Sequence, residues 1–105
     1  MPKKAPFYCL DEVRSAAAAG KLAYGTLRMQ TDAVELGYSR EAVLKILKNL
    51  DAKQFYKNYP DGNFQLDAYK VKAFSNKQQD ELYVKFALRG QGNSMILLVS
   101  FHLNR

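Results

Sequence analysis

The sequence predicts an α+β fold in which about three N-terminal helices pack on one antiparallel β-sheet. Two observations lead to this prediction. Up to residue 50 the apolar residues recur with the period of an amphipathic helix, and beyond residue 52 the period changes to two, as in a strand. Because the helices precede the strands instead of alternating with them, the order is typical of α+β rather than α/β proteins. A chain of 105 residues is long enough for one core, so we expect a single domain over residues 1–105.

Each predicted helix has its own start or stop signals. Asp11 is the expected N-cap of the first helix, and Gly20 stands where a C-terminal glycine would end it. Thr26 is the expected cap of the second helix, which stops at Gly37. Ser39 opens the third helix, which has the most regular pattern of the three. Its apolar residues follow the i, i+3, i+4, i+7 spacing: Val43, Ile46, Leu47 and Leu50.

Three segments of the second half are predicted to be strands: "FQLDAYKVKAF" (64–74), "ELYVKFALR" (81–89) and "SMILLVSFHL" (94–103). The last two are joined by "GQGN", which suits a hairpin turn. Their apolar residues share one face if Leu88 lies opposite Met95, and we expect the helices to cover that face. The same register pairs Phe86 with Leu97, Val84 with Val99 and Leu82 with Phe101.

The opposite face of this predicted hairpin gathers polar residues. His102, the only histidine, becomes a diagonal neighbour of Tyr83, and Lys85 and Arg89 lie on the same face. An outer sheet face without any specific role would also be polar. A second stretch that interleaves aromatic and basic residues, "FYKNY" (55–59), favours a binding role instead. Rings that stack bases, beside cations that hold phosphates, are typical of single-stranded RNA sites.

The overall charge agrees with a polyanionic partner. Lysine and arginine number 16 against 10 acidic residues, which gives a net charge of +6 and a pI near 9.5. The one cysteine, Cys9, cannot form an intramolecular disulfide, and with a single histidine it leaves no zinc constellation. We therefore expect no metal site and no cofactor. The longest purely apolar stretch, Met95 to Val99, is too short to span a membrane, so a cytoplasmic protein is expected.

This inventory suits metal-free cleavage of RNA. There the ribose 2′-hydroxyl attacks the adjacent phosphate, so a site must take one proton, stabilise charge on the phosphoryl oxygens and protonate the leaving 5′ oxygen. Lysine and arginine perform the second task. Histidine suits the first or the third, which makes His102 a candidate. A tyrosine or lysine would act as a base only if neighbouring cations lowered its pKa.

Five segments, in order, carry a resemblance to a known family: "DEVRSAAAAGKL", "ELGYSREAVLKILKNLDAKQFYKN", "DAYKV", "LYVKF" and "LLVSF". From about Cys9 to the C-terminus, the chain resembles the MqsR toxins of bacterial type II toxin–antitoxin systems. The resemblance implies a RelE-like fold and a metal-independent endoribonuclease, an mRNA interferase that often cuts at GC-containing triplets. It also implies a cognate antitoxin that neutralises the toxin, typically with a helix-turn-helix DNA-binding domain.

Carried over by position, the resemblance implies cleavage roles for Lys57 and Tyr83. The family also has a glutamine just before its D-x-Y strand, and Gln65 is the nearest one here, one position earlier relative to Asp67. Where the family often has a lysine after V-S-F, this chain has His102, which either takes part in proton transfer or matters little. We therefore predict a catalytic set of four residues: Lys57, Tyr83, Gln65 and His102. The residues predicted to bind RNA are Tyr56, Lys85 and Arg89.

Two other functions stay open on the sequence. A toxin of the same fold class could block a protein target without cutting RNA, and it would not need Lys57, Tyr83 and a proton donor to converge. A non-catalytic RNA-binding module would share the basic, aromatic face without its chemistry. Incubating the protein with RNA in EDTA separates these functions, because only the nuclease cuts the RNA.

Overall fold

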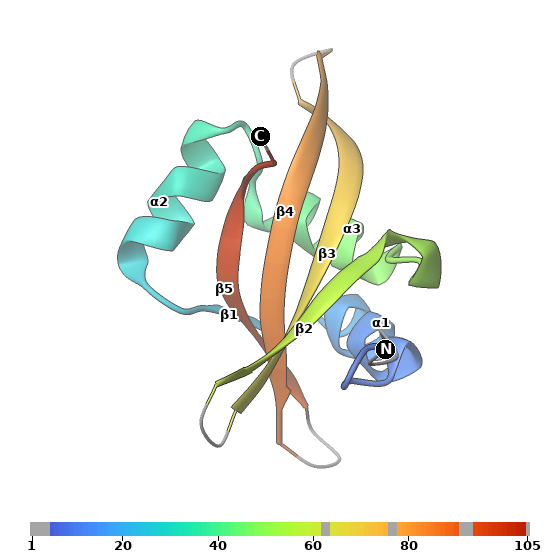
Figure 1. Cartoon of the computed structure of the whole chain (residues 1–105). Helices are drawn as coiled ribbons and strands as arrows, with labels where there is room; N and C mark the ends of the chain where they lie inside the picture. The colour runs from blue at the N-terminus through green and yellow to red at the C-terminus, as the bar shows by residue number, and fades with distance from the viewer. Residues whose placement is uncertain (1–4, 62–63, 76–77, 91–93, 105) are drawn as a thin grey trace.

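The computed structural model describes residues 5–61, 64–75, 78–90 and 94–104. Within these ranges it has three α-helices and a five-stranded sheet, which confirms the predicted α+β class (Figure 1). In chain order the elements are α1 (Leu10–Ala18), β1 (Leu22–Tyr24), α2 (Leu27–Glu35), α3 (Arg40–Lys48), a 3₁₀ helix (Ala52–Gln54), β2 (Phe55–Asp61), β3 (Phe64–Ser75), β4 (Gln78–Arg89) and β5 (Met95–Leu103). No helix in the described part of the chain is long and apolar enough to cross a membrane.

The predicted starts of α2 and α3 are confirmed. The hydroxyls of Thr26 and Ser39 each accept a hydrogen bond from the backbone amide three residues on, at 3.1 and 3.2 Å. The predicted N-cap of α1 is wrong, because the helix already begins at Leu10 and Asp11 lies in its first turn. There its carboxylate is stabilised by the positive end of the helix dipole. The predicted glycine stops of α1 and α2 have positive φ, 73° for Gly20 and 97° for Gly37.

The strand order in the sheet is β1-β5-β4-β3-β2, and only β1 runs parallel to its neighbour. The sequence did not predict β1, because three residues are too few for a period of two to be recognised. Nor did it predict a strand at β2, which contains Pro60. β2 is an edge strand, where a missing N–H is tolerated. At the predicted hairpin turn Gly90 has φ 99°, whereas residues 91–93 lie outside the described ranges.

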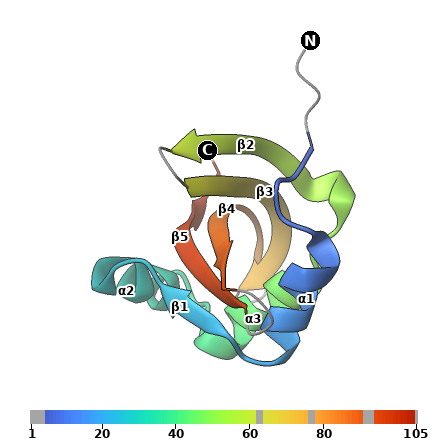
Figure 2. The same ribbon diagram turned by 90° about the horizontal axis from the view of Figure 1, so that it is seen from below.

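The helices gather on one side of the sheet, and β2 lies on the opposite side of the molecule (Figure 2). The core lies between the helices and the sheet face turned toward them. Its fully buried members include Val13, Val43 and Leu47 from the helices and Tyr69, Leu82, Val84 and Phe86 from the strands. We call the other sheet face the outer face. It carries Tyr56, Lys57, Tyr59, Ala68, Lys70, Tyr83, Lys85, Ser100 and His102.

The predicted register of the β4–β5 pair is wrong. Near the connection between the two strands, Leu88 lies opposite Ile96 instead of Met95. Farther along, Tyr83 lies opposite His102, whereas the two were expected to be diagonal neighbours. The tyrosine and the histidine are therefore direct cross-strand partners.

A β-bulge in β5 accounts for the difference. Leu98 and Ser100 pair with adjacent residues of β4, so Val99 between them has no partner in that strand. The buried residues on the two sides of the bulge, Leu98 and Phe101, are consequently three positions apart. With strict alternation, the face that buries Leu98 would also receive His102. The bulge places His102 on the outer face instead.

Candidate active site

The outer face brings residues from four strands into two adjacent cross-strand rows. The first row is Lys57–Ala68–Lys85–Ser100, from β2 to β5. The second row is Lys70–Tyr83–His102, from β3 to β5. Directly opposed residues of antiparallel strands point to the same face, with Cβ atoms about 4.5–5.5 Å apart. The two rows alone therefore bring together four of the seven residues predicted for the site: Lys57, Lys85, Tyr83 and His102.

The second row continues into an aromatic strip. The rings of Tyr83 and His102 stack, with centroids 5.1 Å apart and planes inclined by 15°. Tyr56 joins from β2, where a bulge turns it to the outer face, and it meets Tyr83 edge to face at 6.2 Å. The ammonium of Lys70 lies 3.8 Å from the centroid of the Tyr56 ring. Flat rings beside a cation can hold unpaired bases and a phosphate.

Tyr59 connects the two rows. It follows Lys57 by two positions, so both side chains lie on the outer face of β2. The ammonium groups of Lys57 and Lys85 lie 4.9 and 5.0 Å from the centroid of the Tyr59 ring. The hydroxyl of Tyr59 also interacts with that of Tyr83. The side chain of Tyr59 thus contacts both lysines of the first row through its ring and the tyrosine of the second row through its hydroxyl.

The surroundings of Tyr83 keep it protonated. Burial raises the pKa of the Tyr83 phenol well above its ordinary value of 10.0, and the hydrogen bond with Tyr59 favours the protonated form further. The nearby hydroxyls of Tyr59 and Tyr56 add to the rise in pKa electrostatically. A tyrosine base would need a pKa lowered by the neighbouring lysines. The site therefore offers Tyr83 as a donor of a proton or a hydrogen bond, not as a base.

The His102 ring is exposed and makes one contact with the backbone. Its Nδ1 atom lies 3.0 Å from the carbonyl oxygen of Leu103. Because a carbonyl oxygen only accepts, Nδ1 carries the proton in this contact, and the neutral ring then has its lone pair on Nε2. An imidazole in this tautomer can take a proton from a substrate hydroxyl.

The structure does not bring Gln65 to this surface. The first row passes through Ala68, and Gln65 stands three positions before it on β3. Because side chains alternate along a strand, Gln65 shares the face of Asp67, which is fully buried on the helix side. Leu66 occupies the outer position next to it. The one-residue offset seen in the sequence therefore points Gln65 away from Lys57.

The predicted RNA-binding set changes at three further residues, because Arg89 lies apart from the two rows, whereas Lys70 and Tyr59 join them. Arg89 is exposed at the end of β4, four positions beyond Lys85 and so about 13 Å along the strand from the first row. Lys70 and Tyr59 were not predicted, although they contact predicted residues. Their signal in the sequence was weak, because Lys70 only follows the D-x-Y segment and Tyr59 only closes "FYKNY". Strand pairing alone places them in the site.

A comparison with families of known proteins agrees with this chain over most of its length. Residues 5–103 match the family described as motility quorum-sensing regulator, toxin of MqsA. The chain belongs to the MqsR toxin family. The match confirms the resemblance that the sequence segments carried, and it makes the chain the toxin of a toxin–antitoxin pair. A search among curated proteins finds no match.

On the helix side of the sheet of this MqsR toxin, Asp67 of β3 forms hydrogen bonds with the N-terminal segment and with β2. Its fully buried carboxylate accepts hydrogen bonds from the backbone amides of Phe7 and Tyr8, at 3.0 and 2.9 Å. It accepts a third, at 3.0 Å, from the side chain of Asn58, the residue that follows Lys57. The N-terminal segment and β3 therefore hold the part of the edge strand that carries Lys57.

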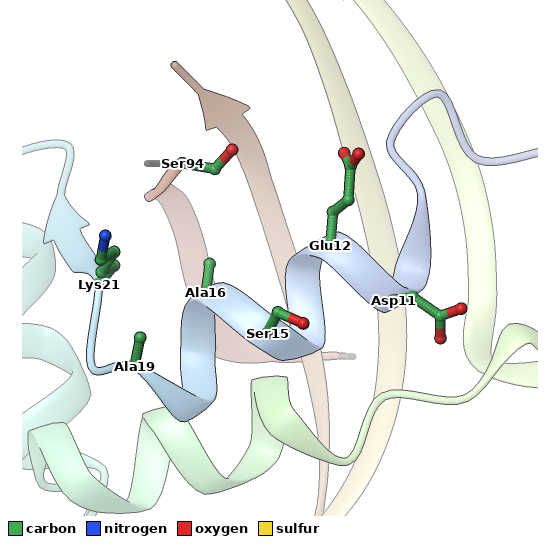
Figure 3. Close-up of a pocket in the computed structure, with 7 residues that line it drawn as sticks. All are labelled: Asp11, Glu12, Ser15, Ala16, Ala19, Lys21 and Ser94. Atoms are coloured by element: carbon green, nitrogen blue, oxygen red, sulfur yellow. The ribbon is translucent and has the colours of Figure 1, made fainter. Parts of the chain in front are cut away.

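A pocket of about 420 Å³ lies elsewhere in the MqsR toxin, between α1 and the start of β5 (Figure 3). It is lined by residues of α1, among them Glu12 and Ser15, and by Lys21 and Ser94. None of these residues belongs to the outer face. Among the residues that the structure describes, no three histidine, cysteine, aspartate or glutamate side chains lie close enough to share a metal ion.

Proposed function

We propose that this MqsR toxin is a metal-independent endoribonuclease that cuts mRNA on the outer face of its sheet. The convergence of Lys57, Tyr83 and His102 from three strands is the observation that carries the proposal. Cutting mRNA in the cytoplasm would stop translation and growth. The antitoxin partner is then expected to bind the toxin directly and to carry a helix-turn-helix DNA-binding domain.

Charge and shape on the outer face suit a single RNA strand. The ammonium groups of Lys57, Lys70 and Lys85 can neutralise successive phosphates, and the net charge of +6 favours the encounter with RNA. Tyr56, which is 36% exposed, offers a ring on which an unpaired base can stack. A duplex would keep its bases stacked on each other, so we expect single-stranded RNA as the substrate.

The proposed reaction uses the residues in three roles. Nε2 of His102 takes the proton of the 2′-hydroxyl, and the 2′ oxygen forms a bond to phosphorus while the bond from phosphorus to the 5′ oxygen breaks. Lys57 and Lys85 stabilise the negative charge on the phosphoryl oxygens. Tyr83 gives its proton to the leaving 5′ oxygen, which is more basic than a phenolate even when the phenol pKa is raised. The products are a 2′,3′-cyclic phosphate and a 5′-hydroxyl.

The test is a cleavage assay on long RNA in EDTA, followed by analysis of the new ends. We expect cleavage with cyclic-phosphate and 5′-hydroxyl ends, and its loss in Lys57→Ala and Tyr83→Ala. Lys53→Ala, which removes an exposed lysine from the 3₁₀ helix just before β2, is the matched control. Intact RNA, both free and during translation on ribosomes, would refute the proposal. RNA that is bound but uncut would favour the non-catalytic binding module.

A further inference from the structure

We propose that Tyr59 is a positioning residue for this cleavage, whose ring holds Lys57 and Lys85 around one phosphate site and whose hydroxyl directs that of Tyr83. The inference rests on the proposed function and assigns a role to a residue that sequence patterns did not single out. Three contacts of one side chain, each with a group proposed to act on the RNA, carry it.

The first row has space for such a ring. Lys57 and Lys85 stand on either side of Ala68 in the row, separated by the width of one strand. The methyl group of Ala68 fills little of the gap, yet Ala68 is 0% exposed although it belongs to the outer face. Longer side chains of this face must therefore cover it. The distances of about 5 Å from the Tyr59 ring to both ammonium groups show that Tyr59 leans over this part of the row.

The ring also reduces an electrostatic cost. Two ammonium groups that converge on one site repel each other, and long lysine side chains in water would otherwise spread over many rotamers. The negative face of an aromatic ring attracts both cations. Tyr59 can thus keep Lys57 and Lys85 in place before RNA arrives, so that less reorganisation is needed when charge develops on the phosphate.

The hydroxyl of Tyr59 acts on the second row. Its interaction with Tyr83 favours the protonated form of Tyr83, as expected when the Tyr83 hydroxyl donates and that of Tyr59 accepts. The Tyr59 hydroxyl therefore orients the proton donor and keeps it protonated until the leaving oxygen takes the proton.

The experiment compares Tyr59→Phe, which keeps the ring, with Tyr59→Leu, which removes it. Tyr24→Phe is the control, because β1 lies at the opposite edge of the sheet. We expect Tyr59→Phe to lower kcat about tenfold and to change KM less than about twofold. We expect Tyr59→Leu to lower kcat similarly and also to raise KM about fivefold, because the lysines lose their shared ring. Thermal melts of each variant check the fold.

A second measurement does not depend on cleavage. Tyrosine labelled with ¹³C at Cζ reports each phenol by NMR, and Tyr83→Phe assigns the Tyr83 signal. We expect Tyr59→Phe, but not Tyr24→Phe, to lower the pH at which Tyr83 ionises. An unchanged titration of Tyr83 would overturn the role of the hydroxyl, and equal KM values in Tyr59→Phe and Tyr59→Leu would overturn the role of the ring. If the wild type cuts no RNA, the proposed function fails, while the titration still decides whether Tyr59 controls Tyr83.

Discussion

The imidazole of His102 stacks on the phenol of Tyr83, with ring centroids 5.1 Å apart and planes 15° from parallel. This contact depends on the bulge at Val99, which turns the last residues of β5 so that His102 faces outward, directly opposite Tyr83. The two side chains proposed to move protons are therefore held side by side by the backbone of two neighbouring strands.

Replacing His102 by phenylalanine separates its two possible contributions. A phenyl ring can stack on Tyr83 but cannot take a proton. We expect His102→Phe and His102→Ala to lower kcat alike, by about 10²–10⁴, with RNA binding by His102→Phe nearly unchanged. Single-turnover cleavage and fluorescence anisotropy of labelled RNA measure the two quantities. Wild-type cleavage by His102→Phe would show that the ring only stacks.

Loss of the Lys57 ammonium should reduce transition-state stabilisation more than RNA affinity. We expect Lys57→Ala to lower kcat about 10²–10³-fold, as removal of one well-placed donor to a developing charge does. Because three ammonium groups share the phosphates, its effect on Kd should stay within about tenfold. Lys53→Ala, matched in charge and exposed just before β2, should cleave like the wild type. Equal losses in both variants would indicate a general charge effect instead of a site.

The activity should persist at moderately alkaline pH. Burial and the Tyr59 hydrogen bond raise the pKa of Tyr83 above its ordinary value of 10.0, so the phenol keeps its proton as the pH rises to 10 and loses it only beyond that. We expect no alkaline decline in initial rate up to about pH 9.5, after subtraction of uncatalysed RNA hydrolysis. A decline centred near pH 8 or 9 would contradict Tyr83 as the proton donor.

Tyr69→Phe should stabilise the fold. The Tyr69 hydroxyl is buried and has no hydrogen-bond partner among the described residues. Its ring stacks on Phe86 at 5.6 Å and meets Phe55 at 5.5 Å, and phenylalanine keeps both contacts. Removing the unsatisfied hydroxyl should add about 1 kcal/mol to the free energy of unfolding, or about 4–8 °C to Tm. A loss of stability at neutral pH would mean that a bound water satisfies the hydroxyl.

Tyr69→Phe should also change how the free energy of unfolding depends on pH. Burial raises the pKa of Tyr69 to about 12 in the folded state, above 10.0 for the unfolded chain. The contribution of the protonated Tyr69 phenol to the free energy of unfolding is therefore fully present below pH 10. It is lost as the pH rises through about 12, because the unfolded chain releases the proton first. The advantage of Tyr69→Phe in urea unfolding should grow between neutral pH and about pH 11. An advantage that does not change with pH would contradict the raised pKa.

Asp67→Ala should destabilise the toxin and disturb the edge strand. The change leaves three N–H donors, from Phe7, Tyr8 and Asn58, without their acceptor in a buried place. We expect a loss of about 2–5 kcal/mol in the free energy of unfolding. Asp32→Ala, on the exposed side of α2, should change it by less than about 0.5 kcal/mol. Chemical denaturation measures both, and similar values would show that Asp67 is not an anchor.

Local features of the sequence determined the class of fold and most helix ends. The caps at Thr26 and Ser39 satisfy backbone amides only three residues away, and the glycine stops need only their own φ angle. The residue types of the site could also be recognised from the sequence, because residues 55–59 and the last two strands contain the aromatic and basic side chains that the proposed RNA cleavage needs. The family match rests on the same linear order of segments.

Only the tertiary structure decided which of these side chains meet. The register of β4 against β5 depends on a bulge at Val99, and Tyr56 reaches the outer face through another bulge in β2. A one-residue shift in a strand reverses every side chain beyond it, so no local pattern could have placed His102 opposite Tyr83 or turned Gln65 away. Strand pairing joins residues far apart in the chain, and its register is set by the packing of the whole core.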